Sequence, residues 1–227
     1  MITFPALIWD TETTGLPDFR KPADDPCQPR MVAMAASLIE VGNKPLATFE
    51  CIIRPDGWTI PVEVARIHGI TTEIAMERGV PLAKAIDAFM ELFDRAEVHA
   101  TYGMLFDEKI RRGECRRLGR PDRFGEKPEV CVMRTLTPIC NLPPSDKMAK
   151  SGRLWPKTPT LTEAVSIILG VPHEKAHDAA ADVEMTARLY DWLAERGHLN
   201  PKVRPSNAGK PVFRAKGGPG AGADEVI

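Results

Sequence analysis

The stretch IWDTETTGLP, residues 8–17, joins a short apolar run to two carboxylates and then turns at Gly15 and Pro17. An apolar run bounded by turn residues is typical of a buried strand. Because alternate residues of a strand share a face, Asp10 and Glu12 would point to the same side. Neighbouring carboxylates repel, and Mg²⁺ or Mn²⁺ would stabilise them through oxygen ligation. Taken alone, a solvated acidic strand end explains the pattern better than a metal site.

The composition indicates one globular domain without a strong overall charge. The chain has 227 residues, 43% of them apolar, and a net charge of −1. Any nucleic-acid surface must therefore be local. Its 5 cysteines form no CxxC pair, which favours reduced thiols over a zinc site. The N-terminal sequence has neither a basic segment nor a long apolar run, so we expect a soluble, cytoplasmic protein.

Apolar periodicity predicts strands and helices around one sheet. Residues 42–45 have the composition of a hairpin turn, so the strands beside them are expected to be antiparallel. The expected strands are 5–9, 31–41, 46–55, 97–103 and 129–133. The expected helices are 82–96, 105–118 with its basic face interrupted by Gly113, 161–169 after the capping box of Thr160 and Glu163, and 179–196, with loops at 17–30 and 141–159. This order predicts an α/β domain with a mixed central sheet flanked by helices.

The composition changes after Gly197. Residues 199–227 are rich in Gly, Pro and Ala, carry several Lys and Arg, and have few large apolar side chains. Such a segment cannot bury enough surface to offset the entropy of ordering. We therefore expect a domain at 1–198 and a flexible basic tail at 199–227.

Further acidic residues and one histidine lie where the expected elements begin. Asp107 opens the helix after the fourth strand, where a carboxylate is also favourable through the helix dipole. His177 precedes the final helix, and Asp182 lies near that helix's first turn. Asp178 is the expected helix N-cap. Each residue alone has an ordinary structural explanation.

The joint pattern resembles the DnaQ-like 3′–5′ exonucleases of the DEDDh type, which have a ribonuclease H-like fold. DTETTGL is similar to their first motif DxExTGL, YGMLFD to HNxxFD, and HDAAAD to HxxxxD. The segment RIHGIT is also similar to the family, and the resemblance covers roughly residues 4–195 in order and spacing. It implies a three-layer fold with a mixed central sheet flanked by helices.

The resemblance also implies a two-metal site. Asp10, Glu12, Asp107 and Asp182 would hold two divalent ions, Mg²⁺ or Mn²⁺, about 4 Å apart. His177 would be the general base, since an imidazole accepts a proton near neutral pH.

The resemblance further places Thr13, Thr14, Leu16 and His68 against the 3′ nucleotide. Leu16 would wedge against a base, or it would fold back onto the sheet. His68 would contact the nucleotide, or it would only end a helix before Gly69. These alternatives stay open at the level of sequence.

One departure from the family lies in the second motif. Tyr102 and Gly103 replace its usual His-Asn pair, whereas Phe106 and Asp107 are kept. We therefore expect the chemistry to survive. The polar contact to the terminal nucleotide, and with it the substrate preference, is left open.

Two basic runs have two interpretations. Residues 109–117 and 147–157 would follow a phosphate backbone, with Trp155 stacking on a base, or they would be ordinary solvated faces.

The sequence thus predicts a metal-dependent 3′–5′ exonuclease. It would hydrolyse terminal phosphodiesters at single-stranded or frayed 3′ ends of DNA and release nucleoside 5′-monophosphates. The alternative is an exoribonuclease of the same family, and a non-catalytic nucleic-acid-binding module is less favoured. A proofreading or DNA-repair role is compatible with this interpretation. The tail would then dock a DNA polymerase or another replication or repair partner, or it would be only a weak non-specific tether.

Overall fold

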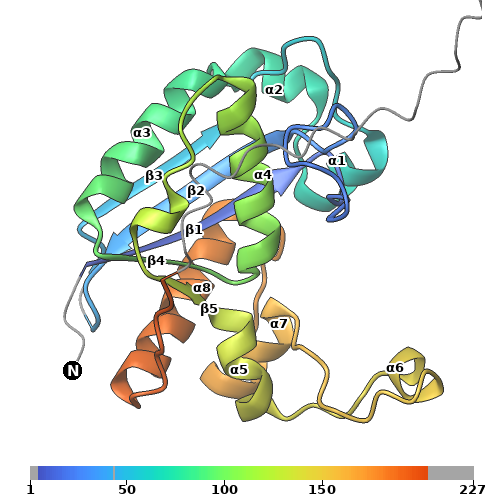
Figure 1. Cartoon of the computed structure of the whole chain (residues 1–227), viewed down its shortest axis with the longest axis vertical. Helices are drawn as coiled ribbons and strands as arrows, with labels where there is room; N and C mark the ends of the chain where they lie inside the picture. The colour runs from blue at the N-terminus through green and yellow to red at the C-terminus, as the bar shows by residue number, and fades with distance from the viewer. Residues whose placement is uncertain (1–4, 43, 204–227) are drawn as a thin grey trace, which may run out of the picture.

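A five-stranded mixed sheet forms the centre of the computed structural model, which describes residues 5–42 and 44–203 (Figure 1). The strand order is β3-β2-β1-β4-β5. The strands are β1 (Ala6–Thr13), β2 (Met31–Ile39), β3 (Ala47–Ile52), β4 (Val98–Thr101) and β5 (Glu129–Cys131). β2 is antiparallel to β1 and β3, as the hairpin turn predicts, whereas β4 is parallel to β1 and β5.

Helices cover both faces of the sheet, which confirms the α/β prediction. One face carries α3 (Leu82–Arg95) and α4 (Met104–Arg117), and the other carries α5 (Val132–Cys140), α7 (Leu161–Ala164) and α8 (Ala179–Glu195). The remaining helical segments are α1 (Val62–His68), α2 (Thr72–Arg78), α6 (Asp146–Lys150), the short η1 (Phe124–Glu126) and the π-helical η2 (Val165–Leu169).

Alternation along β1 assigns its residues to the two layers. Trp9 packs edge-on against Phe89 of α3, with ring centroids 5.3 Å apart. Ile8 belongs to the opposite core, which includes Leu189 of α8. Asp10 and Glu12 continue the Ile8 face by the two-residue period of the strand. The carboxylates therefore lie where the apolar layer beneath α8 ends.

β1 is longer than the strand beside it. Only residues 6–8 of β1 pair with β4, whereas its pairing with β2 continues to Thr13. The outer half of β1 therefore has an open edge on the β4 side. The N-terminal end of α4 fills this place, as the contact of Asp107 with Thr11 shows.

The helix predicted at 105–118 is confirmed as α4, and Gly113 permits close packing, because a Cβ there would lie 2.3 Å from the carbonyl oxygen of Ala23. Other local predictions are wrong. The last expected strand ends at Cys131, and α5 follows it directly. The helix capped by Thr160 widens into the π-helical η2 after Ala164. α6, within the expected loop 141–159, was not predicted, whereas α1 is the helix that the alternative interpretation of His68 had placed before Gly69.

The predicted tail falls mostly outside the described residues. Residues 204–227 are not described. Just before them, Lys202 pairs with Glu129, with N–H to O distances of 2.9 and 3.0 Å. Residues near the expected boundary at 198/199 therefore extend the sheet edge.

Across residues 5–42 and 44–203, no helix combines the length and the apolar character needed to cross a lipid bilayer.

Candidate active site

Two carboxylates enter the site from the end of β1. Asp10 pairs with Ala35 of β2, and Glu12 pairs with Ala33. The register then shifts between Glu12 and Thr13, where the strand turns away. The small alanines opposite the acidic residues leave room above the sheet.

Asp107 arrives from the first turn of α4. Its side chain is buried, and its Oδ1 accepts hydrogen bonds from the Thr11 backbone N at 3.2 Å and the Thr11 Oγ1 at 2.9 Å. These bonds replace the strand partner that β1 lacks at this point. They fix the Asp107 carboxylate beside Asp10.

His177 and Asp182 come from the start of α8. Asp178 is the predicted N-cap, with its Oδ1 accepting from the Ala181 backbone N at 2.9 Å. His177, one residue earlier, has a φ of 69°, a left-handed conformation that is uncommon outside glycine. This turn directs the exposed imidazole back toward β1.

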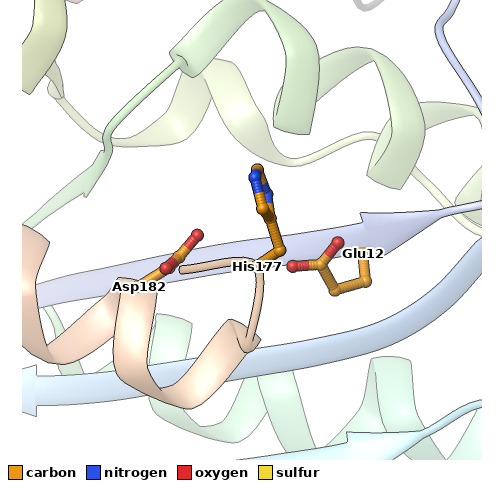
Figure 2. Close-up of side chains that lie close together, drawn as sticks. All are labelled: Glu12, His177 and Asp182. Atoms are coloured by element: carbon orange, nitrogen blue, oxygen red, sulfur yellow. The ribbon is translucent and has the colours of Figure 1, made fainter. Parts of the chain in front are cut away.

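The structure brings three predicted residues into direct proximity. Ligand atoms of Glu12, His177 and Asp182 all lie within 4.8 Å of one another. Figure 2 shows these side chains converging from β1, from the turn before α8 and from α8 itself. Residues far apart in the sequence therefore share one small space.

The electrostatics of this space disfavour negative charge. Burial, followed by repulsion from Asp182, raises the pKa of Glu12 to about 8. Burial likewise raises the pKa of Asp107 to about 7, although its bonds from Thr11 oppose the shift. The pKa of Asp10 is raised well above its ordinary value by burial and by the neighbouring carboxylates. Burial also raises the pKa of Asp182.

The same donor set fits a divalent cation. The carboxylates supply hard oxygen ligands, and among the described residues no Lys or Arg forms an ion pair with Asp10, Glu12, Asp107 or Asp182. A bound cation would remove their mutual repulsion. The site is thus one whose unfavourable charge a metal ion would balance.

A cavity of about 630 Å³ opens above the carboxylates. Leu16 lines it with its residue 87% exposed, so this side chain does not fold back onto the sheet. Thr13 and His68 also line the cavity. Thr14 does not, because its Oγ1 accepts from the Arg30 backbone N at 2.8 Å.

Sequence reasoning missed other parts of this wall. Val64 and Ile67 of α1 line the cavity beside His68. Their i, i+3 and i, i+4 spacing places all three on one helix face and would have indicated them once α1 was known. α1 therefore supplies an apolar wall of the cavity.

His173 is a second omission. Its Nε2 lies 3.0 Å from the Asp182 Oδ1, at ion-pair distance but without hydrogen-bond geometry. Its side chain is only 3% exposed. Sequence spacing does not indicate this contact, because it depends on the course of the loop before α8.

Tyr102 and Gly103 form the part of the cavity where the sequence departs from the family pattern. The buried Tyr102 donates its hydroxyl to the Pro159 carbonyl at 2.8 Å. At Gly103 no atom lies within 4 Å of where a Cβ would stand. Tyr102 thus stabilises one wall of the cavity, and Gly103 leaves space beside it.

Comparison with known proteins gives one family match. The RNase_T model, described as an exonuclease, matches residues 7–190. No curated protein matches the chain.

Solved structures share the fold. E. coli Exonuclease I in complex with a dA16 oligonucleotide has a TM-score of 0.66 at 21% identity, and its zinc-bound form in complex with single-stranded DNA has 0.65 at 21%. Exonuclease I from Methylocaldum szegediense has 0.62 at 25% identity. Each match covers 85% of this chain and 41% of the other, so the chain spans less than half of their length. The likeness confirms the ribonuclease H-like fold.

Proposed function

The chain belongs to the RNase_T exonuclease family, and from this membership we propose that it is a metal-dependent 3′–5′ exonuclease acting on single-stranded or frayed ends of DNA. One observation carries the proposal. Asp10, Glu12, Asp107, His177 and Asp182 line a single cavity, although they come from three separate parts of the chain. A module that only binds nucleic acid has no need for such a costly cluster.

Each member of the cluster has a proposed role. Asp10, Glu12, Asp107 and Asp182 would hold two divalent ions, Mg²⁺ or Mn²⁺. When bound, such ions activate water and stabilise the leaving 3′ oxygen. His177 accepts the proton of the attacking water at an imidazole nitrogen, and its exposed position gives water access. The products are nucleoside 5′-monophosphates and a strand shortened by one residue.

The 3′ nucleotide is proposed to lie in the cavity next to β1. The exposed side chain of Leu16 packs against its base, and Thr13 and His68 contact its sugar or phosphate. Thr14 acts indirectly, since its two hydrogen bonds to the Arg30 backbone, at 2.8 and 2.9 Å, hold the turn that presents Leu16.

DNA is the proposed substrate because the E. coli Exonuclease I structures contain DNA oligonucleotides. Hydrolysis of RNA is the alternative that the experiment must separate. The cytoplasmic location stays a prediction, as does the docking of a polymerase or repair partner through the tail.

The deciding experiment incubates purified protein with 5′-labelled single-stranded DNA, duplex DNA and RNA of one sequence. Each substrate is tested with Mg²⁺, with Mn²⁺ and with EDTA. We expect a ladder shortened from the 3′ end on single-stranded DNA, and none in EDTA. Cleavage that persists in EDTA would rule out the metal mechanism, and a ladder on RNA alone would change the substrate.

The role of His177 is tested by His177→Ala. Loss of a general base should lower the rate by about 10²–10⁴-fold. Calorimetry would measure Mn²⁺ binding to the variant. This binding should persist if His177 is the base and should weaken strongly if His177 is chiefly a metal ligand. His198→Ala is the matched control, because His198 is also exposed but lies against Trp192, outside the cavity.

A further inference from the structure

A loop between α5 and α7 is rooted in the wall of the candidate active site. We name it the basic arm, residues 142–158, and it contains α6. Its ends are held together by the Lys157 N–H, which donates to the Leu142 carbonyl at 3.2 Å. Close ends are typical of Ω-loops, which are often functional. Figure 1 shows α6 projecting from the body of the molecule.

The root of the arm meets the cavity directly. Thr158 and the following residues Pro159 and Thr160 line it. Pro159 is buried and accepts the hydroxyl of Tyr102 at 2.8 Å. The arm therefore leaves the body at the rim of the space proposed for the 3′ nucleotide.

Two large apolar side chains of the arm face solvent. Leu154 is 76% exposed and Trp155 is 60% exposed. Neighbouring exposed side chains of this size are unfavourable in water unless a partner covers them. An exposed indole next to cations is the arrangement on which bases of a single strand stack.

The charge of the arm complements an anion. The arm has one acidic residue, Asp146, and four basic residues, which are Lys147, Lys150, Arg153 and Lys157. Lys157 pairs with Glu163. Among the described residues, Lys147, Lys150 and Arg153 are exposed and form no ion pair.

The other basic run, 109–117 in α4, differs in this respect. Its arginines pair with carboxylates of the same chain, in the pairs Arg111–Asp122, Arg112–Glu108, Arg116–Asp24 and Arg117–Glu114. Charges satisfied within the fold have little left to offer a phosphate. The structure therefore separates two segments that the sequence did not.

We propose that the basic arm binds the single-stranded part of the substrate that lies upstream of the 3′ nucleotide. Trp155 stacks on a base, and Lys147, Lys150 and Arg153 contact phosphates. The polarity of the strand rests on the proposed function, because the 3′ end must occupy the cavity. Because an extended chain from Lys150 to Thr158 would span at most ~26 Å, the residues between them lie within a few nucleotide lengths of the cavity rim.

The experiment compares Trp155→Ala and the triple variant K147E/K150E/R153E with wild type. Binding of a labelled strand of about 15 nucleotides is measured by fluorescence anisotropy in EDTA, at several salt concentrations. Stacking of one base predicts about 5–150-fold weaker binding for Trp155→Ala. Loss of three phosphate contacts predicts a log–log salt slope that is smaller by about 2 for the triple variant.

Activity gives a second readout. The ratio of kcat/KM on the long strand to that on the p-nitrophenyl ester of thymidine 5′-monophosphate should fall in both variants, because the ester has no nucleotide upstream of the bond that is cleaved. The matched control is K84E/R95E, which reverses two exposed cations on α3, and it should keep the ratio of wild type.

The outcomes separate the two proposals. Wild-type affinity and salt slope in both arm variants would overturn the arm proposal, as would equal losses of kcat/KM on the long strand and the p-nitrophenyl ester. If the arm variants weaken DNA binding while wild type degrades no DNA, the arm proposal holds and the proposed activity fails. Unchanged DNA binding would leave a protein partner as the occupant of the arm.

Discussion

Buried charges are unpaired near the N-terminal end of α4 and paired along the rest of the helix. At its N-terminal end, Asp107 lies with Asp10 and the other site carboxylates, and each of them has a raised pKa. From Glu108 onward, toward the C-terminal end of α4, carboxylates instead form ion pairs with guanidinium groups. The fully buried Arg111 is part of it, placed against Asp122 and over the ring of Phe124.

We therefore expect the paired charges to stabilise the fold and the unpaired carboxylates to have a functional role. Removing one partner of a buried pair leaves an uncompensated charge, so the paired end should contribute to stability. Gathered carboxylates cost stability until a cation arrives, so the unpaired end should be a functional site. Substitutions at the two ends should therefore have opposite effects.

The largest expected effect lies at the paired end. Glu114→Ala removes the buried carboxylate that accepts from Arg30 Nε at 2.8 Å and from the Met31 backbone N at 2.9 Å. The free energy of unfolding should fall by about 3–5 kcal/mol, measured by urea denaturation. Asp24→Ala is the control, because Asp24 and Arg116 form an exposed pair and its loss should cost at most about 1 kcal/mol. An equal loss of unfolding free energy in the two variants would contradict a structural role for the paired end.

Asp10→Asn should show the reverse behaviour at the unpaired end. Loss of a proposed metal ligand should lower the exonuclease rate by about 100-fold or more. Because repulsion is relieved, the metal-free protein at pH 8 should gain about 0.5–2 kcal/mol of stability. Both quantities are measured on one preparation, with the exposed substitution Asp87→Asn as control. An Asp10→Asn protein that is less stable without metal would contradict the comparison.

The last expected effect is a dependence of stability on pH, which needs no substitution. Folding raises the pKa of Glu12 from 4.5 to about 8 and that of Asp107 from 3.8 to about 7. Between these limits the folded protein binds more protons than the unfolded chain, so stability is full below about pH 4 and is lost as pH rises through 7 to 8.

Urea denaturation of metal-free protein across this range should show a free energy of unfolding that falls as the pH rises. Mg²⁺ should flatten the decline, since a cation binds the deprotonated carboxylates. Stability that rises between pH 5 and pH 8 without metal would show that the raised pKa values are wrong.

Much of the site could be predicted because it depends on short-range geometry. The two-residue period of β1 put Asp10 and Glu12 on one face, and Asp107 and Asp182 both lie in the first turns of their helices. Such relations are set within a few residues. The joint order of the motifs then indicated that separate carboxylates meet.

What could not be predicted depends on contacts between distant segments. The run 109–117 read as a basic surface, yet Arg111 is fully buried, because its partner Asp122 and the ring of Phe124 lie outside the run. α5 was missed because it contains Pro138 and several β-branched residues, which disfavour a helix by local rules. Tertiary packing overrides these preferences.

The closure of the basic arm at Leu142 and Lys157 has a consequence for variation among relatives. A segment pinned at both ends can change its length and sequence without altering the elements that it joins. Loop-closure entropy adds only about 0.6 kcal/mol for each doubling of length. Replacement of this one surface loop should therefore alter the proposed strand binding and leave the fold around the candidate active site unchanged.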